Sequence, residues 1–100
     1  EIDLAARYGG EEFAVVMSNT DTHRAEKAAE RIRQSIQEHG FVDSDSTVTV
    51  SIGIALFPLD AKLMDELIEK ADTSLYKAKR DGKNRVCAAF LGRDTKLDTG

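Results

Sequence analysis

The sequence predicts a single α+β domain in which strands and helices follow in the order β-β-α-β-α-β and both helices cover one face of a sheet. Three observations lead to this fold. Two adjacent glycines, Gly9 and Gly10, separate two short segments with the character of strands. Apolar residues alternate strictly with small or polar ones between Val48 and Leu56, as in a strand. Two longer segments repeat apolar residues every three or four positions, as helices do.

The N-terminal segment predicts a β-hairpin. Glycine readily adopts the positive φ angles of two-residue turns, so the glycine pair joins an expected strand from Asp3 to Tyr8 to another from Glu11 to Met17. This turn puts the carboxylates of Glu11 and Glu12 at the tip of the hairpin. Because successive side chains of a strand point to opposite faces, we expect these two carboxylates to have different roles.

The first helix is expected to begin after a cap at Asp21 or Thr22, to run to about His39 and to stop at Gly40. Its apolar stripe consists of Ala25, Ala28, Ala29, Ile32 and Ile36. The following strand is expected from Thr47 to Phe57. One of its faces carries only small residues, which favours close packing against a helix and leaves a close-lying ligand as the alternative.

The second helix is expected from Leu63 to Arg80, with Asp60 as its cap and Pro58 ending the strand before it. A last short strand follows at 85–90. Residues 91–100 are polar without periodicity and predict a linker or disordered tail, so the expected domain covers residues 1–90.

Composition excludes several classes of function. The chain has 100 residues, 32% of them charged, and a net charge of -4, which argues against a general binder of nucleic acid or of anionic membranes. A single cysteine, Cys87, excludes an internal disulfide and a multi-cysteine zinc site. No apolar run is long enough to span a bilayer. We therefore expect a soluble cytoplasmic protein, and the start at Glu1 suggests a piece of a longer one.

Four blocks of sequence carry a resemblance to a known family. They are Arg7 to Phe13 (RYGGEEF), Ser51 to Ala55 (SIGIA), Ala71 to Lys79 (ADTSLYKAK) and Gly82 to Val86 (GKNRV). In this order and at this spacing they resemble the GGDEF family of diguanylate cyclases. The resemblance implies a palm-like, ferredoxin-like antiparallel sheet. It also implies that the family's N-terminal strand and two helices are lacking upstream of Glu1.

The resemblance implies an activity for the acidic hairpin. Diguanylate cyclases condense two GTP molecules into cyclic di-GMP, a bacterial second messenger, and release pyrophosphate by metal-assisted attack of a ribose 3′-hydroxyl. Carried over to this sequence, Glu11 and Glu12 would be the catalytic carboxylates that bind Mg²⁺ or Mn²⁺, since Mg²⁺ needs only one or two carboxylates besides phosphate oxygens and water. Gly9 and Gly10 would lie against the nucleotide.

Two lysines would contact the phosphates of GTP by the same match. Lys79 lies next to the end of the second helical segment, and Lys83 lies where the family usually has an arginine. Each also fits an ordinary solvated cation near a helix C-terminus, where the helix dipole favours positive charge.

A product-inhibition site for cyclic di-GMP is implied only in part. Asp3 matches the acidic residue of the family's Arg-x-x-Asp motif, whose arginine would precede Glu1. Arg31 falls near a second inhibitory arginine, although exposed arginines are ordinary on helices.

Three functions remain open at this point. The leading one is a diguanylate cyclase fragment, inactive by itself, from a full-length enzyme that other domains could anchor to a membrane. The second is a non-catalytic GGDEF-like module that binds GTP or a partner and regulates a neighbouring domain. The third is a ferredoxin-like interaction domain without a nucleotide site. Since a central strand would be lacking, we expect uncovered edges and apolar side chains, and therefore a homodimer or domain-swapped oligomer, without nucleic acid or direct membrane contact.

Overall fold

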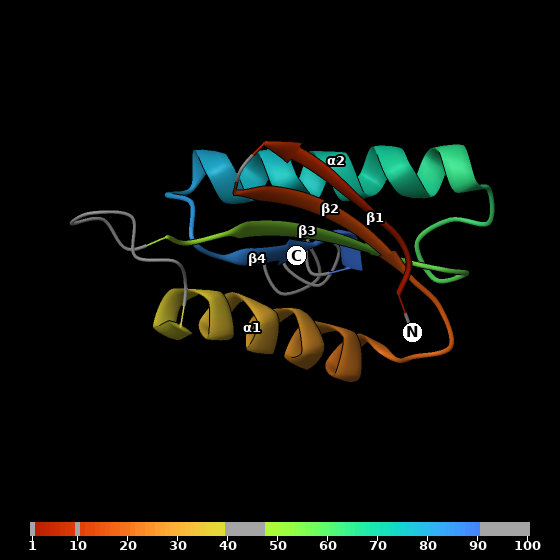
Figure 1. Cartoon of the computed structure of the whole chain (residues 1–100). Coiled ribbons are helices and arrows are strands. Elements are labelled where there is room, and N and C mark those ends of the chain that lie inside the picture. Colours follow the sequence, from red (N-terminus) through yellow and green to blue (C-terminus); the bar gives the residue numbers. More distant parts are fainter. Residues whose placement is uncertain (1, 10, 40–47, 91–100) are drawn as a thin grey trace, which may run out of the picture.

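The computed structural model describes residues 2–9, 11–39 and 48–90 (Figure 1). The elements follow in the predicted order β-β-α-β-α-β. They are β1 (Ile2–Gly9), β2 (Glu12–Met17), α1 (Thr22–His39), β3 (Ser51–Leu56), α2 (Met64–Arg80) and β4 (Val86–Ala88). The expected linker at 91–100 and the expected helix stop at Gly40 lie outside the described residues.

The four strands form one sheet in the order β1-β2-β3-β4. β1 pairs antiparallel with β2, as the hairpin prediction requires, whereas β2 with β3 and β3 with β4 are parallel. The expectation of an antiparallel sheet is therefore wrong for two of the three strand pairs. The two strands of each parallel pair are joined through a helix, which returns the chain to the end of the sheet at which the first of the two strands began.

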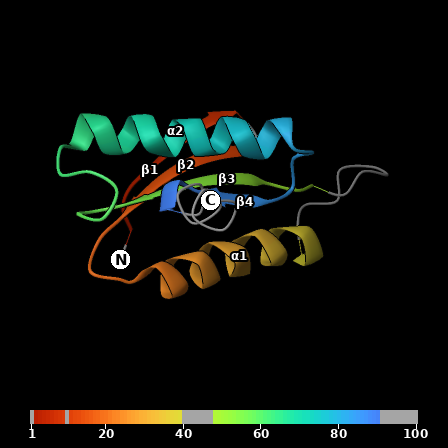
Figure 2. The same cartoon turned by 180° about the vertical axis from the view of Figure 1, so that it is seen from behind.

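The helices cover opposite faces of the sheet, so the expectation of helices on one face is also wrong. Figures 1 and 2 show α2 on one side of the strands and α1 on the other. The reason lies in the strands, because every residue of β3 is buried and β2 buries both Val15 and Val16, whose side chains point to opposite faces. Strands that are apolar on both faces need cover on both.

The α2 face of the sheet is built from small residues. A Cβ added at Gly53 would overlap the carbonyl oxygen of Ala71 and the amide nitrogen of Leu75, and would lie 2.7 Å from the Leu75 Cα. This agrees with the prediction that the small-residue face of the strand serves packing. The apolar cluster on this face consists of Ala14, Val16, Ala55, Leu67, Ala71 and Leu75.

The α1 face is built from larger residues and is less completely covered. α1 packs chiefly against β3 and β4. Toward β1 and β2 it leaves a cavity of about 190 Å³ with an entirely apolar lining, and Ile32 at its rim is 41% exposed. The lining residues are Ala5, Phe13, Val15, Met17, Ala29, Ile32, Ile36 and Ile52.

The two predicted helix caps have different outcomes. Asp21 caps α1 as predicted, because its Oδ1 accepts a hydrogen bond from the Arg24 amide at 2.7 Å. Asp60 does not cap α2, which begins at Met64 after Leu63. It is buried in the turn that follows β3, where its Oδ2 accepts a hydrogen bond from the Leu56 amide at 2.7 Å.

The expectation of uncovered strand edges is not met between β2 and β3. β2 and β3 pair directly along all six residues of each strand, from Glu12 with Ser51 to Met17 with Leu56. No edge is left open between these two strands. Neither described helix is long and apolar enough to cross a membrane.

Candidate functional site

The acidic pair lies at the end of the hairpin, as predicted. Glu11 is in the turn and exposed, and Glu12 is the first residue of β2 and half-buried. Gly9 ends β1 opposite Glu12, and Gly10 is outside the described residues. The two neighbouring carboxylates thus have different surroundings.

An ion pair joins the hairpin to the C-terminal end of α2. Lys79 Nζ lies 3.1 Å from Glu12 Oε1, and the two side chains are 37% and 29% exposed. Partial burial weakens screening by solvent, so this pair is held more firmly than a fully exposed one. Two residues that the sequence analysis selected from separate motifs therefore touch.

A shallow depression of about 250 Å³ surrounds this ion pair. It is lined by Glu12, Asp72, Leu75, Tyr76 and Lys79. Asp72 Oδ1 is buried there and has no hydrogen-bond partner among the described residues. A buried carboxylate oxygen without a partner is costly, so a donor or a cation that reached Asp72 would stabilise it.

Lys83 lies in a loop of unusual backbone conformation. Gly82, Lys83 and Asn84 have φ angles of 129°, 63° and 49°, so three successive residues are in the left-handed half of conformational space. The Lys83 amide donates a hydrogen bond to the Ala78 carbonyl at 2.9 Å, which closes the end of α2. The Lys83 side chain itself is exposed.

Ser51 connects this loop to the hairpin. Its amide donates a hydrogen bond to the Glu11 carbonyl at 2.9 Å, and its Oγ accepts one from the Asn84 amide at 3.2 Å. Ser51 also pairs with Glu12 in the sheet. The acidic tip, the end of α2 and the Lys83 loop therefore gather at one end of the sheet.

Sequence reasoning missed Arg33, which reaches the Lys83 loop from α1. Its guanidinium forms a bidentate ion pair with Glu30 and donates a hydrogen bond to Asn84 Oδ1 at 2.8 Å. The hydrogen bonds from Arg33 lower the pKa of Glu30, and those to Glu30 raise the pKa of Arg33. The available signal was the position of Arg33 beside the apolar stripe, between Ala29 and Ile36, where a charged residue becomes partly buried.

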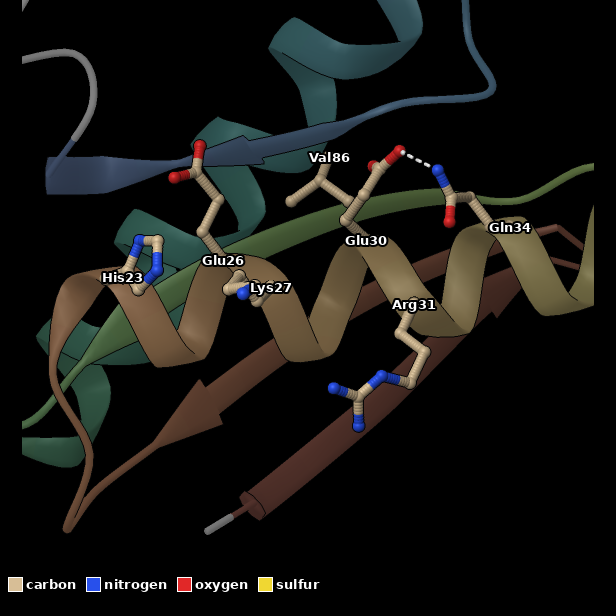
Figure 3. Close-up of a pocket in the computed structure, with 7 residues that line it drawn as sticks. All are labelled: His23, Glu26, Lys27, Glu30, Arg31, Gln34 and Val86. Carbon is tan, nitrogen blue, oxygen red and sulfur yellow. Dashed lines mark hydrogen bonds between the residues drawn. The ribbon is translucent and has the colours of Figure 1, made fainter.

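The two candidate inhibitory residues lie on different elements. Asp3 is in β1, at a register shift between Ile2 and Leu4, and only its backbone is described. Arg31 is exposed on α1 and lines a broad depression with residues of the same helix and Val86 of β4. Figure 3 shows its guanidinium directed away from Glu26 and Glu30, which point toward β4.

Cys87 lies half-buried in β4, and burial raises the pKa of its thiol. A thiol that is less readily ionised is a poorer nucleophile.

The residues at the hairpin fit a divalent cation with oxygen ligands. Among the residues that the structure describes, no three His, Cys, Asp or Glu side chains gather into a metal site. This excludes a closed structural site built from those residues but suits Mg²⁺, which takes one or two carboxylates and completes its shell with phosphate oxygens and water. Glu11 and Glu12 would supply such carboxylates at the end of the hairpin.

Comparisons with known proteins identify the family. The model of the diguanylate cyclase GGDEF domain matches residues 1–85. Diguanylate cyclase A of Treponema denticola is 43% identical over 86 residues, which are 84% of this chain and 23% of that protein. The probable diguanylate cyclase DgcT of Escherichia coli is 40% identical over 88 residues, 84% of this chain and 20% of that protein.

The response regulator PleD of Caulobacter vibrioides is 38% identical over 89 residues, 85% of this chain and 20% of that protein. The chain thus spans between a fifth and a quarter of the length of these curated relatives. A search of the solved structures finds no match. The matched region contains the four blocks of sequence that carry the resemblance, with the exception of Val86, the last residue of the fourth block. The chain belongs to the GGDEF domain family of diguanylate cyclases.

Proposed function

We propose that this chain supplies the catalytic carboxylates and the phosphate contacts of a diguanylate cyclase that makes cyclic di-GMP from two GTP molecules. The observation that carries the proposal is the Glu12–Lys79 ion pair, 3.1 Å long, which joins the acidic hairpin to the basic end of α2. The family match and the curated relatives named as diguanylate cyclases support the activity.

Each side chain has a distinct task in this proposal. A divalent metal bound by Glu11 and Glu12 would activate the ribose 3′-hydroxyl and stabilise the charge on the α-phosphate and on the departing pyrophosphate. Lys79 neutralises Glu12 before the nucleotide arrives and is placed to donate hydrogen bonds to its phosphates. Lys83, exposed in its loop, reaches the same phosphates.

The proposed partners follow from the chemistry. The condensation joins two nucleotides, so two GTP-loaded copies must face each other, which makes a homodimer the working form. The apolar cavity between α1 and the hairpin strands provides surface for self-association. Asp3 and Arg31 are the proposed contacts for inhibitory cyclic di-GMP, and we place the enzyme in the cytoplasm.

A non-catalytic module that binds GTP and regulates a neighbouring domain is the second candidate. The exposure of Glu11 favours it over the cyclase, since an acidic residue in open solvent loses little by binding no metal. The Glu12–Lys79 pair next to the unpartnered Asp72 oxygen favours the cyclase.

The test is Glu11→Gln in the full-length protein, with turnover of labelled GTP measured in the presence of Mg²⁺. A neutral amide cannot replace a metal-binding carboxylate, so turnover should fall by about 100-fold or more while the melting temperature stays close to that of wild type. Glu66→Gln, exposed at the far end of α2, is the matched control. Product formation by Glu11→Gln at near wild-type rate would refute the cyclase assignment of this residue.

A further inference from the structure

Arg33 crosses from α1 to the loop that carries Lys83. Its side chain is only 14% exposed, and Nε, Nη1 and Nη2 all donate hydrogen bonds. Nε and Nη2 bind the Glu30 carboxylate, while Nη1 donates to Gln37 Oε1 at 3.1 Å and to Asn84 Oδ1 at 2.8 Å. The bidentate pair fixes the plane of the guanidinium and so aims Nη1 at Asn84.

The loop needs such support because its backbone is strained. Lys83 and Asn84 are not glycines, yet their φ angles are 63° and 49°, a region that costs side chains with a Cβ free energy. A strained conformation persists only where its surroundings fix it. Here the Asn84 amide is held by Ser51 and the Asn84 side chain by Arg33.

We propose that Arg33 is a positioning residue of the phosphate site, which through Asn84 holds the 82–84 loop in its left-handed conformation and so keeps Lys83 at the same end of the sheet as Glu12 and Lys79. The kinetic part of this inference rests on the proposed function. The structural part, that Arg33 holds the loop closed, stands without it. Nε, Nη1 and Nη2 of Arg33 each donate to a protein group, so its proposed task is to position Lys83 and not to bind phosphate.

Arg33 and Arg31 are two positions apart on α1 and have separate tasks. Arg31 is exposed at the surface depression of Figure 3. Glu30 lines that same depression and is the ion-pair partner of Arg33. The outer surface of α1 and the loop of Lys83 are therefore linked through two consecutive polar contacts, from Glu30 to Arg33 and from Arg33 to Asn84.

The first experiment is limited trypsin digestion, which reports the loop directly through the rate of cleavage after Lys83. This rate should rise about tenfold in Arg33→Ala, equivalent to a loss of about 1.4 kcal/mol of protection against local opening. It should stay at the wild-type value in Arg24→Ala, an exposed arginine of the same helix. An unchanged rate in Arg33→Ala would overturn the inference.

Two further variants, Asn84→Gly and Asn84→Asp, test the same contact from the loop side in case Arg33→Ala fails to fold. Glycine tolerates the positive φ but lacks the side chain, so Asn84→Gly should also expose Lys83 to trypsin while leaving the Arg33–Glu30 pair intact. Asp keeps an oxygen acceptor for the guanidinium and should retain protection. Equal protection in Asn84→Gly and Asn84→Asp would contradict the role of the side chain.

The second experiment separates positioning from general stability. In the full-length protein, Arg33→Ala should raise the KM for GTP in the presence of Mg²⁺ about tenfold with a smaller change in kcat. The effect should vanish in a Lys83→Ala background, because a residue that acts through Lys83 has nothing left to position. Additive effects would overturn the inference. Normal kinetics in Lys83→Ala alone would refute the phosphate contact and the kinetic role of Arg33 together, whereas unchanged trypsin cleavage in Arg33→Ala refutes only the inference about Arg33.

Discussion

The two faces of the sheet are held to their helices in different ways. On the α2 face, Gly53 lets the backbone of α2 approach so closely that no Cβ fits between them. On the α1 face, the side chains are larger, an apolar cavity remains open toward the hairpin, and Ile32 is 41% exposed. There the C-terminal half of α1 is connected to the 82–84 loop by the hydrogen bond from Arg33 to Asn84, and Arg33 is itself held by Glu30 of the same helix.

The two lysines of the candidate site, Lys79 and Lys83, are held in place in these two different ways. Lys79 belongs to α2, whose position is fixed by shape, and it lies directly on Glu12. Lys83 belongs to a strained loop whose position depends on Arg33 of α1. One of the two proposed phosphate contacts is thus anchored by close packing of small residues, and the other by a polar clamp that charge or pH can weaken.

The largest effect is expected from Gly53→Ala, which breaks the shape-based contact. The new methyl group must push α2 away from β3, which costs about 1–3 kcal/mol or more in the free energy of unfolding. Urea denaturation measures this cost. The comparison of faces is sharpened by Ile32→Ala on the α1 face, which is expected to cost no more than about 1 kcal/mol because the side chain is half exposed. A larger loss for Ile32→Ala than for Gly53→Ala would reverse the comparison.

A smaller, pH-dependent effect is expected from Glu30→Gln, which weakens the polar clamp. The hydrogen bonds from Arg33 lower the pKa of Glu30 below its ordinary value of 4.5 in the folded protein. The stability that Glu30 contributes is therefore fully present above pH 4.5 and is lost as the pH falls through the lowered pKa of the folded state. Wild type should exceed Glu30→Gln in stability at pH 7, and this advantage should disappear at strongly acidic pH.

Urea titrations at a series of pH values test this prediction. Glu26→Gln is the control on the same helix, because Glu26 has no ion pair among the described residues. An advantage of wild type over Glu30→Gln that is independent of pH would show that the ionised carboxylate does not stabilise the clamp.

Much of the fold follows from local sequence. The cap of α1 at Asp21 and the end of α2 at Arg80 were both predicted, because caps and helical periodicity depend on residues a few positions apart. The neighbours of each strand do not follow, because alternation along a strand says nothing about which strand pairs with it. For that reason the parallel pairing of β2 with β3 was not predicted. The antiparallel sheet that the family resemblance implied is likewise not found for β2, β3 and β4.

The residues of the candidate site also differ in whether the sequence predicted them. Glu12 and Lys79 were selected from separate motifs, and their contact agrees with the family match. Arg33 and Asn84 are 51 positions apart and neither belongs to a local pattern that indicates a contact. The position of Asp60 in the sequence suits a helix cap, but in the structure its carboxylate accepts a hydrogen bond from the backbone amide of Leu56. Polar contacts between distant segments need the tertiary structure.

The central claim is that Glu12 and Lys79 form a metal and phosphate site and are not merely a structural ion pair. A charge reversal, Glu12→Lys combined with Lys79→Glu in the full-length protein, tests it most directly. The reversed pair can re-form, and a partly exposed pair contributes only about 0–1 kcal/mol, so the melting temperature should stay close to that of wild type. Turnover of GTP should nevertheless fall at least about 100-fold, because a cation then occupies the metal side and an anion faces the phosphates. Recovery of GTP turnover in the reversed protein, above that of either single variant, would contradict the account.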